Sequence, residues 1–192
     1  CAAGRIAGLM GMSGIRFDMN GVTILAGDCR ETMFLQTIDE LCEAAVHNPR
    51  HIAESLSRLW RFGGQHPTAN VLNHSLEVAW MCRHLSPAAQ LWALFHDAHE
   101  ILTGEIPRQH KSIEILNIQG FYDMRLKTAL GVALSSSEEK EIERQDTLSG
   151  DMERKHWAGY IWQWRQEQYR LEIAVEYFLH DYNGLMFSVN GV

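Results

Sequence analysis

Histidine and acidic side chains gather in the middle of this sequence. Five of the ten histidines fall between residues 66 and 99, and the densest cluster is His96-Asp97-Ala98-His99-Glu100. We expect a helix here, on which His96 and Asp97 project about 100° apart, so that both can lean toward one ion at the helix edge. Glu100 follows one turn later on the same side. The cluster therefore predicts a metal site with a carboxylate close to a water activated by the metal.

Two further side chains could complete such a site. His74 lies on the preceding predicted helix, and Asp146 lies on a later one. By itself His74 is better interpreted as a core histidine, but four candidate ligands in order on three helices are what a helical bundle needs to hold one cation. A second pair, His180-Asp181, has no such companions. We interpret it as a cation at a helix C-terminus beside a solvated acid.

The elements that must position these residues are helices. Apolar residues recur with helical period over most of the chain, and Pro49, Ser86-Pro87 and Gly184 supply start and stop signals. The predicted helices cover residues 31–46, a segment opening at Pro49, and residues 71–85, 86–104, 111–130, 137–157 and 162–182. Only residues 15–25 alternate like strands, around the turn dipeptide Asn20-Gly21. We predict a mostly α-helical protein with a short N-terminal β-hairpin.

Length and composition fit one globular domain. The 192 residues are 46% hydrophobic and 21% charged, which predicts a single domain over residues 15–192 after a flexible leader, residues 1–14. The net charge of −7 argues against binding to duplex nucleic acid or an anionic membrane, because each phosphate contact needs a cation. The four cysteines form no C-x-x-C pair, and no apolar run is long enough to span a membrane. We expect reduced thiols and a cytoplasmic location.

Four short motifs resemble those of a known family. They are Trp60-Arg61-Phe62-Gly63-Gly64, His74-Ser75-Leu76-Glu77-Val78-Ala79, His96-Asp97-Ala98-His99-Glu100 and Thr103-Gly104-Glu105-Ile106-Pro107. Together with Asp146 they are similar to the H…HD…D pattern of the HD-domain phosphohydrolases. Within that family the chain most resembles the small helical 5′-deoxynucleotidases and related phage nucleotide phosphohydrolases, over residues 50–180. The resemblance implies a single HD-domain helical bundle.

The same resemblance implies one divalent metal ion and its ligands. The implied ligands are His74, His96, Asp97 and Asp146. Two imidazoles and two carboxylates suit Mn²⁺, Co²⁺, Fe²⁺, Ni²⁺, Zn²⁺ or Mg²⁺, and the sequence does not choose among them. Such an ion would act as a Lewis acid and orient a water for attack at phosphorus. We expect Glu100 to position or deprotonate that water, and Glu105 is a further candidate for a catalytic group.

Candidate substrate-binding residues surround the motifs. They are Trp60, Arg61, His66, His99 and Lys111. Arg61 has a planar, permanently charged side chain that matches phosphate, although an exposed arginine at a helix end is the alternative. His66 and Lys111 are each either a phosphate contact or an ordinary loop or surface residue. His99 is either a hydrogen-bond partner of the site or a surface residue.

Several functions remain open at this point. We expect removal of the 5′-phosphate from deoxynucleoside monophosphates, giving nucleoside and phosphate. A competing reaction releases triphosphate from a deoxynucleoside triphosphate such as dATP. A non-catalytic, metal-containing, nucleotide-binding regulatory domain is the third possibility. The expected partner in each case is a small nucleotide, and analogy with the family favours a homo-oligomer.

Overall fold

The fold is given by a computed structural model that describes the backbone of residues 16–19, 22–25, 35–64, 69–157 and 171–190. Side chains are described for residues 35–64, 69–155 and 174–189. The chain divides into two compact units, Cys1–Phe34 and Leu35–Val192. Each unit is described by itself, and the prediction of one domain over residues 15–192 stays a prediction.

The first unit contains two short strands. These are β1 (Arg16–Met19) and β2 (Val22–Leu25), which pair antiparallel with Arg16 opposite Leu25 and Met19 opposite Val22. The turn predicted to join them, Asn20-Gly21, lies outside the described residues. The N-terminal β-hairpin therefore stays a prediction.

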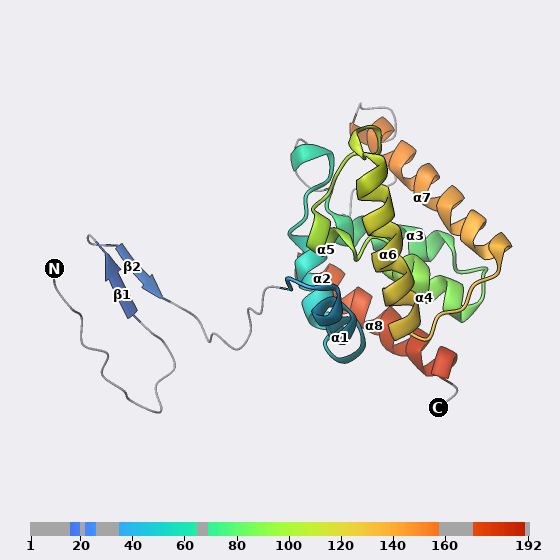
Figure 1. Cartoon of the computed structure of the whole chain (residues 1–192), viewed down its shortest axis with the longest axis horizontal. Coiled ribbons are helices and arrows are strands. Elements are labelled where there is room, and N and C mark those ends of the chain that lie inside the picture. Colours follow the sequence, from blue (N-terminus) through green and yellow to red (C-terminus); the bar gives the residue numbers. More distant parts are fainter. Residues whose placement is uncertain (1–15, 20–21, 26–34, 65–68, 158–170, 191–192) are drawn as a thin grey trace. The chain divides into compact units, whose positions relative to one another are not determined.

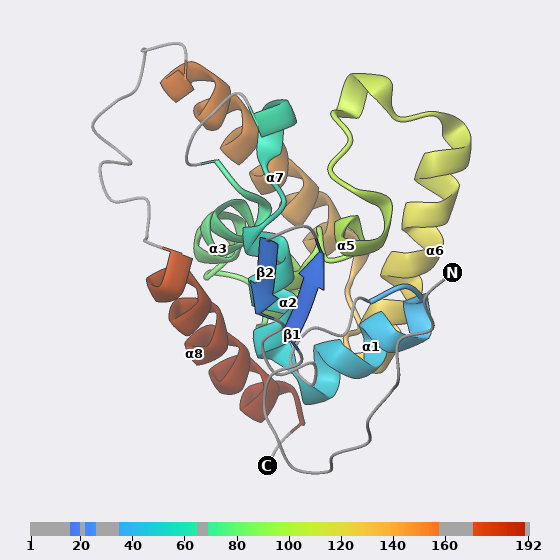
Figure 2. The same ribbon diagram turned by 90° about the vertical axis from the view of Figure 1, so that its left-hand side faces the viewer.

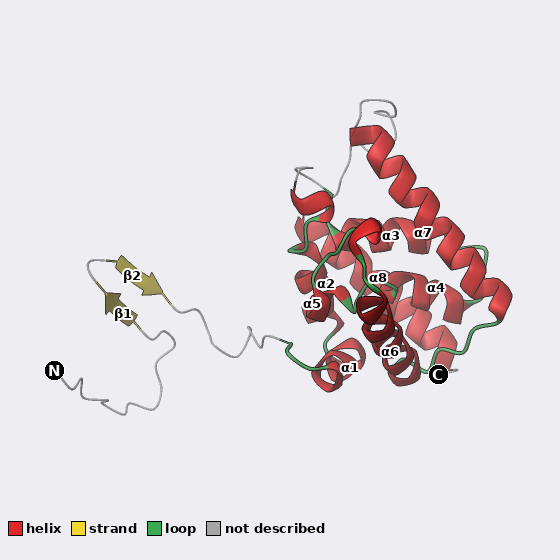
Figure 3. Ribbon diagram, turned by 45° about the horizontal axis from the view of Figure 1, so that its top comes forward, coloured by secondary structure: helices red, strands yellow, loops and turns green. Residues whose placement is uncertain are grey.

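The described part of the second unit is built from helices (Figure 3). Its α-helices are α1 (Ile38–His47), α2 (Pro49–Ser57), α3 (Val71–Met81), α4 (Pro87–Phe95), α5 (Glu100–Thr103), α6 (Ile113–Ala129), α7 (Ser136–Trp157) and α8 (Leu171–Asn190). Two short 3₁₀ segments, Arg61–Gly64 and Arg108–His110, lie in the connections. The prediction of a mostly α-helical protein is confirmed. None of the described helices is both long and apolar enough to cross a membrane.

Local sequence signals set most of the helix starts. The side chain of Asn48 accepts a hydrogen bond at the start of α2, where Pro49 occupies the first turn, and Ser86 does the same for α4 ahead of Pro87. Asn70 caps α3 and Ser112 caps α6 in the same way. Each cap satisfies a backbone N–H that would otherwise have no partner at the helix end. The predicted starts at Pro49 and Ser86-Pro87 are confirmed.

The core forms where α4 packs between α3 and α8 (Figure 1). In the view of Figure 2, α8 runs below α3 and beside α2, both of which it contacts. Phe95, the last residue of α4, is fully buried, and its ring lies 5.2 Å from Phe178 and 5.8 Å from Tyr182 on α8, measured between centroids. The Tyr182 hydroxyl donates a hydrogen bond of 2.9 Å to the Val46 carbonyl at the end of α1. These contacts anchor the end of α4, which is the point where the His96-Asp97 pair begins.

Several predicted helix ends are wrong. The fourth helix does not continue to residue 104: α4 ends at Phe95, and residues 96–99 form a tight turn before α5. The first helix begins at Ile38 instead of residue 31, because Thr37 and Glu40 form a reciprocal capping box that starts it there. The third helix ends at Met81 instead of residue 85.

The last helix also differs from the prediction. Gly184 does not end it, since α8 runs through this glycine to Asn190. Beyond the glycine, Leu185, Met186 and Val189 pack against the core. A glycine inside a helix costs about 1 kcal/mol relative to alanine, which such packing can offset. His180-Asp181 consequently lies inside a helix and not at its end.

Candidate metal centre

The four predicted metal ligands meet at one point, although they come from three segments of the chain. His74 lies on α3, His96 and Asp97 on the turn after α4, and Asp146 on α7. His74 Nε2 is 2.9 Å from Asp146 Oδ1 and 3.7 Å from Asp97 Oδ2. His96 Nε2 is 3.3 Å from Asp97 Oδ2 and 3.8 Å from Asp146 Oδ1.

These spacings suit a single divalent ion. Ligand atoms bound at about 2.1 Å to one ion are separated by about 3.0 Å when adjacent and about 4.2 Å when opposite. The four measured distances fall in or next to this range, and the group His74, His96 and Asp146 could hold a metal ion. The donor set of imidazole nitrogen and carboxylate oxygen is the borderline set that first-row divalent metals accept.

Both imidazole rings are fixed by hydrogen bonds on the side away from this point. The Nδ1–H of His96 donates to the Ala93 carbonyl, 2.8 Å away. The Nδ1–H of His74 donates to the hydroxyl of Ser149 at 3.1 Å, and that hydroxyl donates onward to Glu77 at 2.7 Å. Each ring therefore turns Nε2 toward the carboxylates of the centre, where Nε2 of His74 donates a hydrogen bond to Asp146 Oδ1 at 2.9 Å. With Nδ1 held on the other side, Nε2 is the nitrogen of each ring that can bind a metal in place of a proton.

The charges and lone pairs gathered at the centre favour the binding of a cation. His96 Nε2 is buried and has no hydrogen-bond partner among the described residues. Burial lowers the pKa of His96, but Asp97 and Asp146 outweigh it and raise that pKa well above the ordinary value. Burial likewise raises the pKa of Asp97, and His96 outweighs it and holds this pKa well below the ordinary value. Two ionised carboxylates facing two imidazole lone pairs are stabilised by a shared positive charge, either a proton or a metal ion.

The turn that contains His96 and Asp97 ends directly before Glu100, the first residue of α5. Its backbone hydrogen bonds span three residues: the Glu100 amide donates to the Asp97 carbonyl at 2.9 Å, and the Ala98 amide to the Phe95 carbonyl at 2.9 Å. Residues three apart are eclipsed in this tighter 3₁₀ geometry. The Glu100 carboxylate therefore lies directly beside Asp97. The predicted α-helix through both residues is therefore wrong, because α4 ends at Phe95 and α5 begins at Glu100.

Glu100 is an acid with an unusual environment. It is 3% exposed, and its Oε1 lies 3.7 Å from the ammonium group of Lys111. Burial, followed by the charge of Asp97, raises the pKa of Glu100 to about 9. A carboxyl group of this kind holds a proton at neutral pH unless a cation stands next to it. The sequence left Lys111 open as either a phosphate contact or a surface residue. In the structure its ammonium group lies next to this acid.

Arg61 is a buried part of the centre and not an exposed arginine at a helix end. Its Nε donates a hydrogen bond of 2.9 Å to Glu153 Oε2, and its NH1 lies 3.5 Å from Asp97 Oδ2. The backbone turns sharply after it, with positive φ at Phe62 and Gly63. Positive φ at a bulky residue such as Phe62 is strained, so the surrounding contacts must hold this turn in place.

The remaining candidates are distributed around this centre. Burial raises the pKa of Glu105, while Arg61 and the backbone N–H of Phe62 act in the opposite direction, so Glu105 belongs to the same electrostatic environment. Trp60 is 46% exposed and is joined to Asn70 by a β-bridge. His66 lies outside the described residues.

His99 is a buried residue, which removes the surface alternative. It is 5% exposed, and its Nδ1 lies 2.8 Å from Asp123 Oδ1 on α6. The second His-Asp pair is different. The exposed side chains of His180 and Asp181 contact each other at 3.2 Å, and neither takes part in the contacts described for the four predicted ligands.

Glu153 is a buried acid of this cluster that the sequence analysis missed. It is almost fully buried on α7, where it binds Arg61 and lies 3.6 Å from His74 Nδ1. Burial raises its pKa, but His74 and Arg61 outweigh this effect and lower it, so Glu153 stays ionised. A signal was present in the sequence: Asp146, Ser149 and Glu153 follow the three- and four-residue spacing of one helix face.

Neither a scan against models of protein families nor a search of curated proteins finds a match to this chain. Membership of the HD-domain family therefore stays a prediction.

Proposed function

We propose that this protein is a metal-dependent phosphohydrolase that removes the 5′-phosphate of nucleotides, with deoxynucleoside monophosphates as the substrate. The observation that carries the proposal is the convergence of two imidazoles, each held through Nδ1 on the side away from the centre, with two carboxylates around the unpartnered Nε2 of His96. The H…HD…D motifs resembling a phosphohydrolase family supply the reaction class.

The ion would be held by His74, His96, Asp97 and Asp146. When bound, a divalent ion supplies Lewis-acid chemistry, because it lowers the pKa of water and orients it for in-line attack at phosphorus. Asp146 is the most exposed of the four ligands at 35%, so this side of the centre is the one open to a substrate.

Three further side chains have roles in the proposed reaction. Glu100 takes the proton of the attacking water: its carboxyl group lies beside Asp97, and a bound cation there would offset the burial and the charge of Asp97 that raise its pKa, so that it is ionised and can accept a proton. Arg61 and Lys111 place positive charge beside the acidic cluster, and a phosphate group needs this charge to approach it. Glu153 fixes the Arg61 guanidinium through Nε and thereby orients it.

The decisive experiment compares products across substrates. The full chain is stripped of metal with a chelator, reloaded with Mn²⁺, and incubated with each nucleoside and deoxynucleoside mono- and triphosphate. We expect inorganic phosphate and nucleoside from monophosphates, abolished by Asp97→Ala and by Glu100→Gln. Asp181→Asn alters the other His-Asp pair and serves as the matched control with full activity. A fully active Asp97→Ala protein would overturn the proposal.

The same assay separates the competing functions. Release of triphosphate from a deoxynucleoside triphosphate would assign the triphosphohydrolase reaction instead. Stabilisation by Mn²⁺ with neither product formation nor any thermal response to nucleotides would assign a regulatory domain. A cytoplasmic location and a homo-oligomeric state are part of this proposal.

A further inference from the structure

A second group of potential metal ligands adjoins the first. Asp97, His99 and Glu100 each offer one ligand atom, and these atoms lie within 4.8 Å of one another. Asp97 is also one of the four ligands proposed for the first ion. His99 and Glu100 take no part in the ligand set proposed above, and both are more than nine-tenths buried.

His99 is oriented as metal-binding histidines are. Its Nδ1–H donates to the carboxylate of Asp123 at 2.8 Å, which leaves the lone pair on Nε2. That Nε2 atom is buried and has no hydrogen-bond partner among the described residues. A carboxylate that holds one ring nitrogen while the other faces a polar site is the usual support for a histidine ligand. A buried nitrogen acceptor without a donor is otherwise unfavourable.

Glu100 presents a second unpartnered atom. Its Oε2 is buried and has no hydrogen-bond partner in the described part of the chain. Lys111 does not satisfy it, because the lysine ammonium approaches the other oxygen, Oε1, and only to 3.7 Å. The two unsatisfied atoms therefore belong to neighbouring residues of a single turn, next to Asp97.

The charge around the centre leaves room for a second cation. Five described carboxyl groups interact electrostatically with Arg61, namely Asp97, Glu100, Glu105, Asp146 and Glu153, and Lys111 is the second basic side chain that acts on Glu100 and Glu105. When all five carboxyl groups are ionised, one divalent ion added to these two cations still leaves one negative charge in excess. A phosphate substrate would add more, and like charges at this separation repel strongly in a buried site.

We propose that Asp97, His99 and Glu100 form a second site for a divalent transition-metal ion, bridged to the first ion by the Asp97 carboxylate. The proposal rests on the first metal site of the proposed function. Two ions sharing a carboxylate lie about 3.5–4 Å apart, a separation that lets both contact one phosphate group. Filling this second site would occupy Glu100 as a ligand, so the reaction in which Glu100 accepts a proton belongs to the form of the protein with one ion.

The experiment counts ions and measures their coupling. The chelator-stripped full chain is titrated with Mn²⁺ by equilibrium dialysis, and the loaded protein is measured by electron paramagnetic resonance. We expect two ions per chain and a spectrum showing exchange coupling between two Mn²⁺ ions. His99→Gln should bind one ion and show no coupling, while His180→Gln, an exposed histidine on α8, should behave as the unaltered chain. Asp123→Asn should keep both sites but weaken the second by about 10- to 100-fold.

Each outcome has a distinct meaning. One ion per chain in the unaltered protein overturns the second site and leaves the proposed function standing. No bound ion overturns both. Two ions retained in His99→Gln, with the coupling intact, would show that the second ion lies elsewhere. If His99→Gln fails to fold, as judged by circular dichroism, the Asp123→Asn titration decides, and an unchanged second affinity overturns the proposal.

Discussion

A buried carboxyl group such as Glu100 should make the metal-free protein sensitive to alkali. Its pKa is raised from 4.5 to about 9, so between these values the folded chain keeps a proton that the unfolded chain releases. Its contribution to stability is complete at acid pH and is lost as the pH rises, by up to about 1.4 kcal/mol per pH unit. Glu100→Gln removes this term, so in the presence of chelator it should be more stable than the unaltered chain at pH 8 and nearly equal to it at pH 5. Urea unfolding at the two pH values measures this, and equal differences at both would contradict it.

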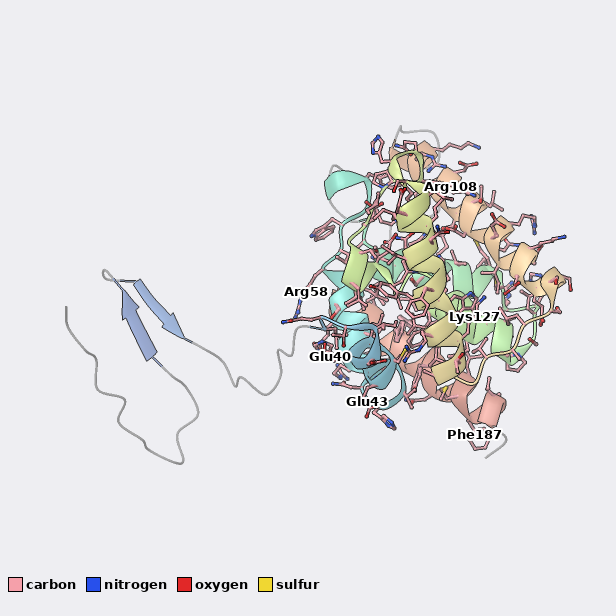
Figure 4. All side chains as sticks on the ribbon, in the orientation of Figure 1. Glu40, Glu43, Arg58, Arg108, Lys127 and Phe187 are labelled. Atoms are coloured by element: carbon pink, nitrogen blue, oxygen red, sulfur yellow. The ribbon has the colours of Figure 1, made fainter. Side chains whose placement is uncertain are left out.

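Replacing Glu153 should destabilise the fold, because the buried Arg61 guanidinium would lose its charged partner. Glu153→Gln removes the charge that binds the buried Arg61 guanidinium through Nε. Weakening one partner of a buried ion pair costs about 2–4 kcal/mol, since the other charge stays buried. Thermal unfolding measures the loss. The matched control is Glu143→Gln. Glu143 lies on the same helix as Glu153, and the substitution alters an exposed ion pair with Arg108 (labelled in Figure 4), so it should cost less than about 0.5 kcal/mol. Similar losses in the two variants would show that Glu153 is not a buried anchor.

At the scale of elements, the packing of the end of α4 in the core holds the turn with the candidate metal ligands in place. Phe95 is fully buried against α8 and immediately precedes His96. Phe95→Ala should cost about 3–5 kcal/mol of folding free energy and should also weaken Mn²⁺ binding, because the turn that carries the ligands loses its anchor. Calorimetric titration of the folded variant measures the second effect. Phe187→Ala is the control, since Phe187 on α8 is 66% exposed (Figure 4) and should change neither quantity appreciably.

The continuation of α8 through Gly184 gives another prediction for an element. A Cβ added at Gly184 meets no atom within 4 Å, and the backbone there is helical. Gly184→Ala should therefore raise the unfolding free energy by up to about 1 kcal/mol. If Gly184 instead ended the helix in a left-handed conformation, the same substitution would destabilise the protein. Chemical unfolding of the two proteins distinguishes these structures by the sign of the change.

At the scale of the whole molecule, one ion would join segments that are far apart in sequence. Its ligands extend from His74 on α3 to Asp146 on α7, so metal binding should stabilise the folded chain as a unit. Saturating Mn²⁺ at 100 times its dissociation constant should add about 2.7 kcal/mol to the unfolding free energy. At a fixed Mn²⁺ concentration the gain should grow as the pH rises toward the raised pKa of His96, because below that pKa the ion must displace the proton that His96 retains. Melting curves with Mn²⁺ or chelator test this, and a shift that persists in Asp146→Asn would contradict it.

The sequence by itself determined the features that depend on neighbouring residues. Pro49 and Ser86-Pro87 start helices because caps and proline act within one turn. The order of the histidine and aspartate candidates along the chain could also be read from the sequence without knowledge of the fold. The capping box at Thr37 and Glu40 was equally local, and it could have placed the start of α1 correctly.

The tertiary structure decided whatever depends on partners distant in the chain. α8 passes through Gly184 because residues beyond it pack on the core, and α4 stops at Phe95, which α8 holds in place. Arg61 and Glu153 are 92 residues apart, and only the fold shows that they form a buried pair. The same is true of His99, whose partner Asp123 lies on another helix. Spacing along a chain fixes direction around a helix axis, but the distance between two helices depends on the packing of all the side chains between them.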